Sequence, residues 1–199
     1  MVKNYTDKQI FDRIKSLPSY DAKKGIPDDT VVLIMSNEDT PNVFDDKLYP
    51  YIDGVNPFVA TCTGNAGGTI LTGGWKKYST KGAAIIARDE IYYDAYRKSD
   101  GKTIRHHNGK MPCLRLVGNL KYYRDNDNDT KAEQLGEPII ANYATNIHLN
   151  SYNLWNKVVN TFIGNWSAGC IVLNNAEQYR RLLDIFDSKP ITLVVLNEF

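Results

Sequence analysis

The stretch GNWSAGCIVL (residues 164–173) brings a cysteine to the junction of a polar segment and an apolar one. Ala168 and Gly169 come just before Cys170 and leave the backbone beside its sulfur uncovered. The run that starts at Ile171 is typical of a buried β-strand. A free cysteine is usually a small buried hydrophobe, so three interpretations stand at this point: a core side chain, a metal ligand or a nucleophile.

A histidine that precedes Cys170 in the sequence favours the interpretation of Cys170 as a nucleophile. His148 lies in NYATNIHLN (142–150), and we expect one strand over 139–149 that ends near it. A loop and a return strand would then bring His148 and Cys170 to one end of a sheet. An imidazole within reach of the sulfur can stabilise a thiolate or accept the thiol proton.

Composition limits the class of protein. The chain has 199 residues, enough for one domain with a real core, and a formal net charge of +1. Lysines and arginines are scattered, without a basic stripe interleaved with aromatic residues, so no nucleic-acid partner is expected. The three cysteines can form one disulfide at most, and none has the Cys-x-x-Cys spacing of a structural zinc site.

The N-terminal residues 1–16 are charged throughout and lack the apolar core of a secretory signal. No stretch is long and apolar enough to predict a membrane span. We therefore expect synthesis in the cytoplasm, so that action in the periplasm or cell wall would require lysis or a dedicated export system.

Two helical patterns flank a β-rich chain. Residues 6–17 predict an amphipathic helix capped by Thr6 or Asp7, and residues 174–188 predict a second one with an asparagine cap. The helix-rich start, 1–27, is interpreted as an extension of a domain that spans 28–199. The fold class expected is mainly β with flanking helices.

Several apolar runs predict strands, of which 30–36 and 191–197 are the most continuous. Residues 47–63 predict a hairpin, because Asp53-Gly54 supplies a tight primed turn. Residues 82–124 alternate short β-type runs with turns. The glycine-rich residues 64–74 lack the Lys-Ser/Thr ending of a phosphate loop, so we interpret them as a plain loop.

Two other candidate metal sites are weaker. Asp125, Asp127 and Asp129 alternate as in a calcium loop, but Thr130 and Gly136 stand where that loop needs glycine and glutamate. A solvated Asx-rich turn is the better interpretation.

His106 and His107 are adjacent, so on a strand they would point to opposite faces and are poorly placed to share a metal. An exposed loop pair is expected, although one of them could join His148 in a metal site.

Together, His148 and Ser167-Ala168-Gly169-Cys170-Ile171 resemble the signature of the L,D-transpeptidase (YkuD-like) catalytic domain: a strand-end histidine, then Ser-x-Gly-Cys and an apolar strand. The similarity is sharp over about residues 141–174 and looser over 28–199. It is greatest to the divergent members encoded by phages and mobile elements. The resemblance implies a β-sandwich or barrel fold and a cysteine enzyme that acts on peptidoglycan stem peptides without a cofactor or a metal.

The resemblance also implies a role for each matching residue. Cys170 would attack a stem-peptide carbonyl and form a thioester, and His148 would be the general base, held in its tautomer by the carbonyl of Leu149. Gly169 and Cys170 would offer oxyanion-hole amides, and Ser167 would brace the turn. An amine acceptor would give transpeptidation, and water would give hydrolysis.

The chain departs from the family pattern at three positions. Leu149 and Ala168 replace a glycine and a histidine, and Val172 replaces an arginine. The missing cation would have to come from elsewhere, and the candidates are Arg88, Arg105 and Arg115.

Two alternatives remain open. A degenerate domain could bind cell-wall fragments without turnover. A zinc peptidase could use His148, Cys170 and one of His106 or His107.

Overall fold

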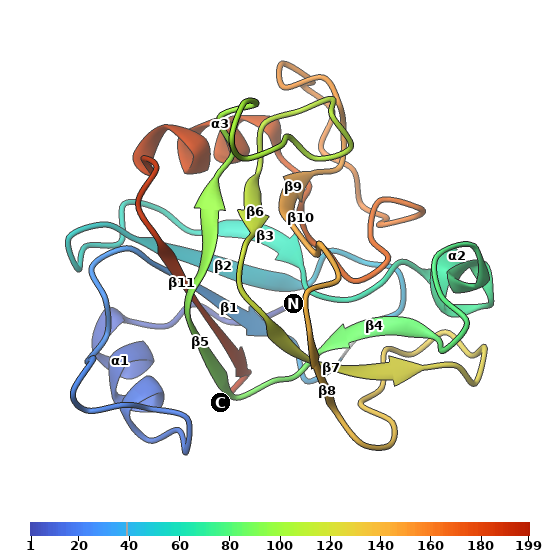
Figure 1. The fold of residues 1–199 in the computed structure, drawn as a ribbon, viewed down its shortest axis with the longest axis horizontal. Helices are drawn as coiled ribbons and strands as arrows, with labels where there is room; N and C mark the ends of the chain where they lie inside the picture. The colour runs from blue at the N-terminus through green and yellow to red at the C-terminus, as the bar shows by residue number, and fades with distance from the viewer. Residues whose placement is uncertain (39) are drawn as a thin grey trace.

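The computed structural model of the protein describes residues 1–38 and 40–199. Its centre is a closed eight-stranded barrel in the order β1-β11-β5-β6-β9-β10-β3-β2 (Figure 1). The fold is therefore mainly β with a few short helices, as the sequence predicts. The barrel strands are β1 (Thr30–Met35), β2 (Asp46–Tyr51), β3 (Ala60–Thr63), β5 (Glu90–Lys98), β6 (Leu114–Leu116), β9 (Ile147–Leu149), β10 (Ile171–Leu173) and β11 (Ile191–Asn197).

The two apolar runs noted in the sequence become β1 and β11, which pair in parallel with Val32 opposite Val194. Every residue of β1 is buried, because the strand is covered on both faces. Val31 and Leu33 point into the barrel core, whereas Val32 and Ile34 pack under the N-terminal segment.

That segment contains helix α1 (Asp7–Lys15), which begins as predicted. Thr6 and Gln9 form a reciprocal capping box at its start. Ile10 and Ile14 lie on the buried face and pack against the outside of β1 and β11. The division of the chain at residue 27 stays a prediction, and these contacts show that the N-terminal part is packed on the barrel.

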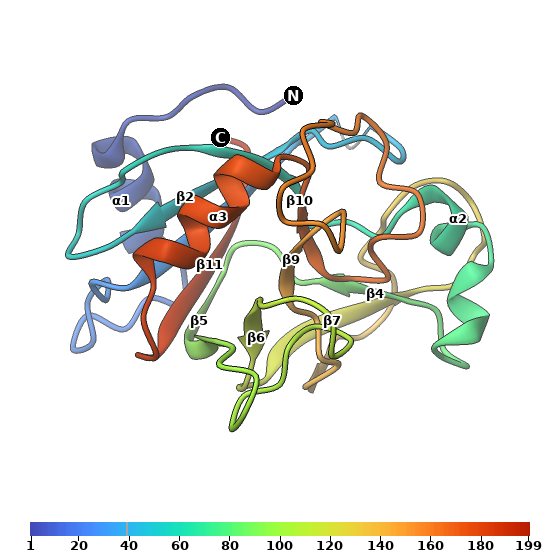
Figure 2. The ribbon, with the colours of Figure 1, turned by 90° about the horizontal axis from the view of Figure 1, so that it is seen from above.

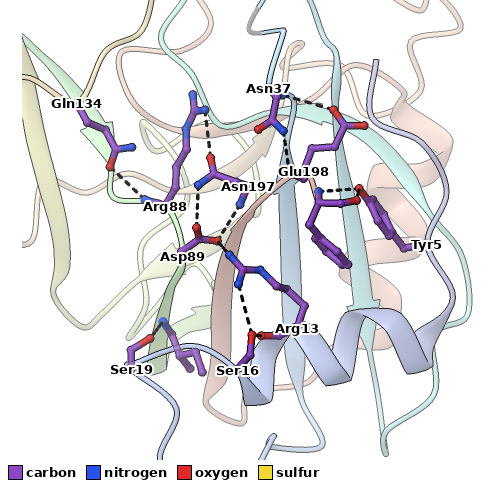
Figure 3. A network of polar contacts seen from close by, with 12 residues as sticks. Tyr5, Arg13, Ser16, Ser19, Asn37, Arg88, Asp89, Gln134, Asn197 and Glu198 are labelled. Atoms are coloured by element: carbon purple, nitrogen blue, oxygen red, sulfur yellow. Dashed lines mark hydrogen bonds and ion pairs between the residues drawn. The ribbon is translucent and has the colours of Figure 1, made fainter.

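Polar contacts also hold α1 to the barrel (Figure 3). Arg13 forms an ion pair with Asp89 at 3.0 Å. The Asp89 carboxylate accepts hydrogen bonds from the backbone and side-chain amides of Asn197 at 3.1 and 2.8 Å. Because Asn197 ends β11, this network ties α1, the turn before β5 and the last barrel strand together.

A second, three-stranded antiparallel sheet lies beside the barrel, in the order β4-β7-β8 (Figure 1). Its strands are β4 (Ala83–Ile86), β7 (Leu120–Asp125) and β8 (Ile139–Ala141). The single strand expected over 139–149 is wrong: β8 belongs to this sheet and β9 to the barrel. The intervening residues 142–146 form the link between the two sheets.

The glycine-rich residues 64–74 are not a plain loop, which corrects the sequence interpretation. They contain helix α2 (Gly68–Leu71) and lead into the 3-10 helix η1 (Gly74–Lys77). Burial of Ile70, Leu71 and Trp75 explains these short helices, because the apolar side chains pack with Ile85 of β4.

The predicted hairpin and the second predicted helix are both present. Asp53 and Gly54 have positive φ angles of 50° and 74° in the turn between β2 and β3. Helix α3 (Ala176–Ile185) is capped by Asn175, and Tyr179 and Leu182 of α3 join the barrel core. Seen from above in Figure 2, α3 lies over the barrel on the side nearest the viewer. Within the described residues, no helix has the length and apolar character needed to cross a membrane.

Candidate active site

His148 and Cys170 lie on neighbouring strands, but these strands run parallel. Val172 of β10 pairs with His148 at the centre of β9, and Cys170 lies just before β10. The return strand expected from the sequence is therefore wrong: residues 150–170 cross over and re-enter in the same direction. The juxtaposition still results, because parallel neighbours bring equivalent ends together.

His148 is fully buried and held in one tautomer. Its Nδ1 donates a hydrogen bond to the carbonyl oxygen of Leu149 at 2.9 Å. The contact that the resemblance implies is thus present. Nε2 must then carry the lone pair of the neutral ring, and it has no hydrogen-bond partner among the residues that the structure describes.

A third side chain, His107, completes a cluster with His148 and Cys170. Ligand-type atoms of the three residues all lie within 4.8 Å of one another. The rings of His107 and His148 are stacked, with centroids 3.9 Å apart and planes 21° apart. The exposed histidine pair expected from the sequence is therefore wrong, since His106 is also partly buried and its Nδ1 is 2.9 Å from the Ser99 hydroxyl.

Two asparagine side chains contact the ring nitrogens of His107. The Oδ1 of Asn146 accepts from the Leu116 amide at 3.2 Å, which turns its Nδ2 toward His107 Nδ1 at 3.1 Å. Nδ1 of His107 then accepts from Asn146, and its Nε2 lies 3.1 Å from the Nδ2 of Asn108, so an amide NH2 group faces each ring nitrogen.

Cys170 is partly exposed and lines a cavity of about 170 Å³. Aromatic and small residues make up much of its wall, among them Trp75, Tyr143 and Ala168. Cys170 therefore borders this cavity, whereas His148 is fully buried. The other two cysteines are buried.

Burial keeps the candidate pair neutral at rest. It raises the pKa of the Cys170 thiol to about 12, although a backbone hydrogen bond from Asn146 acts in the opposite direction. It lowers the pKa of His148 to about 3, with a further contribution from His107. The resting state is a thiol beside a neutral imidazole, so the ring can act as a base but the pair is not a preformed ion pair.

The turn before Cys170 is braced by Ser167. The Ser167 hydroxyl donates to the Cys170 carbonyl at 2.8 Å and accepts from the Gly169 amide at 3.2 Å. Gly169 has a φ of +125°, and a Cβ there would lie 2.6 Å from the carbonyl oxygen of Ala84. The Gly169 amide is thus already engaged, whereas the Cys170 amide, the second predicted oxyanion donor, has no hydrogen-bond partner among the residues described.

The arginine in the Cys170 cavity is Arg124, which is not among the three arginines expected from the sequence. Arg124 of β7 lines the cavity, stacks on the Tyr143 ring with its guanidinium carbon 3.9 Å from the centroid, and donates to the Gly82 carbonyl at 3.2 Å. Its Nε is buried without a partner among the described residues. Arg124 reaches the cavity because β7 pairs with β4, and no local sequence pattern predicts this pairing.

Neither Arg88 nor Arg115 lines this cavity, contrary to the candidates named from the sequence. Arg88 donates to Asn197 at 3.4 Å. Arg105 and Arg115 line a separate cavity with His107.

The same cluster is the strongest candidate for a transition metal, since two imidazoles and a thiol are zinc ligands. The hydrogen bonds count against it: the lone pair of His107 Nδ1 is taken by Asn146, and stacked rings do not point to a common centre. Asp127, Asp129 and Glu133 also lie within 4.8 Å of one another on the surface. Their backbone hydrogen bonds, such as Asp129 N to Asp127 Oδ1 at 3.0 Å, are those of the predicted Asx-rich turn.

Comparisons with protein-family models, with curated proteins and with solved structures give no match for this chain, so the geometry of the site is the evidence on its function.

Proposed function

We propose that the protein is a cysteine-dependent acyl-transfer enzyme of the L,D-transpeptidase type that acts on peptidoglycan stem peptides. The observation that carries the proposal is the arrangement of His148. One ring nitrogen is fixed on the Leu149 carbonyl, and the other is unpartnered within the described chain, in a cluster with the Cys170 thiol. A buried imidazole with a free lone pair beside a reachable thiol is the arrangement that general-base activation requires.

The reaction proceeds in two steps. The Cys170 sulfur attacks a peptide carbonyl while its proton passes to Nε2 of His148, and the Cys170 amide stabilises the oxyanion. Collapse of the tetrahedral intermediate breaks the C–N bond, and the imidazolium returns its proton to the leaving amine. Water or an acceptor amine then attacks the thioester, which regenerates the thiol and yields a carboxylate or a new amide.

Two further features support this assignment. The closed, mainly β barrel with the cysteine at the start of a strand agrees with the fold class that the resemblance implies. Arg124 supplies a cation in the Cys170 cavity, where Val172 has replaced the arginine of the family pattern. A carboxylate of the stem peptide is the substrate group that Arg124 would contact.

The test is incubation of the protein with purified muropeptides followed by mass spectrometry. Cleavage or exchange of a stem-peptide bond is expected, together with an acyl adduct on Cys170. The Cys170→Ser variant should lose turnover and keep its fold, because the two side chains are nearly isosteric. Full activity of that variant would refute the proposal.

A second outcome corresponds to the binding-domain alternative, which the raised pKa of Cys170 favours. Muropeptides would then be retained by the protein but recovered unchanged, with no adduct on the sulfur. Retention without turnover would replace the enzyme proposal.

A further inference from the structure

A cavity of about 450 Å³ lies on the other side of the link between the two sheets. Ala144 and Asn146 line this cavity, whereas Tyr143 and Thr145 line the Cys170 cavity. The segment 143–146 thus separates the two cavities, with Tyr143 and Thr145 on one side and Ala144 and Asn146 on the other. Buried tyrosines hold it in place, since Tyr96 donates to the Thr145 carbonyl at 2.8 Å.

The larger cavity is basic. Arg105, Arg115 and His106 contribute to its wall, with the amides of Asn108 and Asn146, and no carboxylate is among its lining residues. We refer to it as the basic cavity.

The charge of the basic cavity is concentrated by the local sequence. Residues 97–115 contain six lysines and arginines and a single acidic residue, in a chain whose net charge is +1. That acid, Asp100, is already engaged by the Thr103 hydroxyl and the amides of Lys102 and Ile104. It therefore does not serve as a counter-ion in the cavity.

One of the lining arginines, Arg115, also has a like-charge neighbour in the sheet. Arg97 of β5 and Arg115 of β6 are directly paired in the antiparallel ladder, so their side chains leave the sheet on the same face. Like charges in such a pair are destabilising. Within the described residues neither Arg105 nor Arg115 forms an ion pair.

We infer that the basic cavity binds an oxyanion, the carboxylate or phosphate group of a small ligand, between Arg105 and Arg115. The planar guanidinium groups can donate paired hydrogen bonds to a carboxylate or a phosphate. The neighbouring side-chain amides can donate to the remaining oxygens of the anion. The occupant lies beside His107, whose ring stacks on His148. The inference does not depend on the thiol chemistry, because Cys170 does not line this cavity.

The experiment is a titration of ¹⁵N-labelled protein with sodium phosphate and, separately, with sodium glutarate, at ionic strength held constant with chloride. Saturable shifts of the Asn146 side-chain amide and the His107 ring are expected with at least one anion. Saturation by phosphate alone or by glutarate alone identifies the source. Shifts that grow linearly with both anions, without saturation, would overturn the inference.

Variants locate the site. Arg115→Gln should weaken binding at least tenfold without lowering Tm, since it removes one member of the like-charge pair, and Arg105→Gln should weaken it by a similar factor. Arg181→Gln is the matched control, because Arg181 lies on α3 over the Phe58 ring. Unchanged affinity in both cavity variants, or an equal loss in the control, would refute the assignment. Cys170→Ala should bind the anion as the parent does, so failure of the enzyme proposal would leave this result intact.

Discussion

Replacing His148 by Gln should change how the stability of the protein depends on pH. In the folded state the pKa of His148 is about 3, against an ordinary value of 6.5. The unfolded chain therefore binds a proton at mildly acidic pH that the folded chain excludes, so His148 costs stability as the pH falls. At about pH 5 the cost is ~2 kcal/mol, from ~1.36 kcal/mol per pKa unit over about 1.5 units. It grows until the pH reaches the folded pKa.

The assay is urea denaturation of the parent and of His148→Gln at several pH values between about 5 and 7.5. The stability of the parent relative to the variant should fall by ~2 kcal/mol across this range. Comparison of the two proteins cancels other titrations, notably that of buried Asp46, whose pKa is raised to about 7 by burial. A difference between parent and variant that is independent of pH would refute the assignment of His148 as an imidazole buried in neutral form.

Three further outcomes are expected. Gly169→Ala should destabilise the protein by about 3 kcal/mol in urea denaturation, because its Cβ would meet the Ala84 carbonyl, whereas Gly164→Ala, with open space at its Cβ, should cost only about 1 kcal/mol. Arg124→Gln should lower kcat/KM on muropeptides by ten- to a hundredfold, about 1.5–3 kcal/mol for a charge-assisted hydrogen bond, and an unchanged value would exclude a substrate contact. Alkylation of Cys170 should abolish turnover and EDTA should leave it unchanged; the reverse pattern would establish the zinc peptidase.

Local patterns predict the elements of this fold well. The Thr6 capping box, the Asp53-Gly54 turn and the continuous apolar run of β11 each contain their own structural signal, and each forms where it is expected. The closed barrel is different, because its closure depends on pairing between β1 and β11, which no local pattern encodes. The relative direction of paired strands cannot be predicted from the sequence for the same reason, as the parallel pairing of β9 and β10 shows.

The candidate site divides in the same way. Cys170 and His148 are recognisable because small residues and a strand flank the thiol and a histidine precedes it. The sequence names His107 as one of two histidines that could lie beside His148, whereas Arg124 comes from the second sheet and only tertiary structure brings it to the site. The burial of His148 and Cys170 also depends on the tertiary structure. The shifted pKa values follow from burial, which neither residue's neighbours in sequence predict.

The parallel pairing of β1 with β11 has a consequence for how the molecule folds. Residues such as Val32 and Val194 are distant along the chain, so closing the barrel has a large entropic cost before any contact compensates it. Folding is then slow in comparison with helical proteins of this size. Until closure, β3, β9 and β10 lack a complete barrel around them. The thiol of Cys62, which is buried in β3 in the native state, is exposed to oxidants throughout that interval.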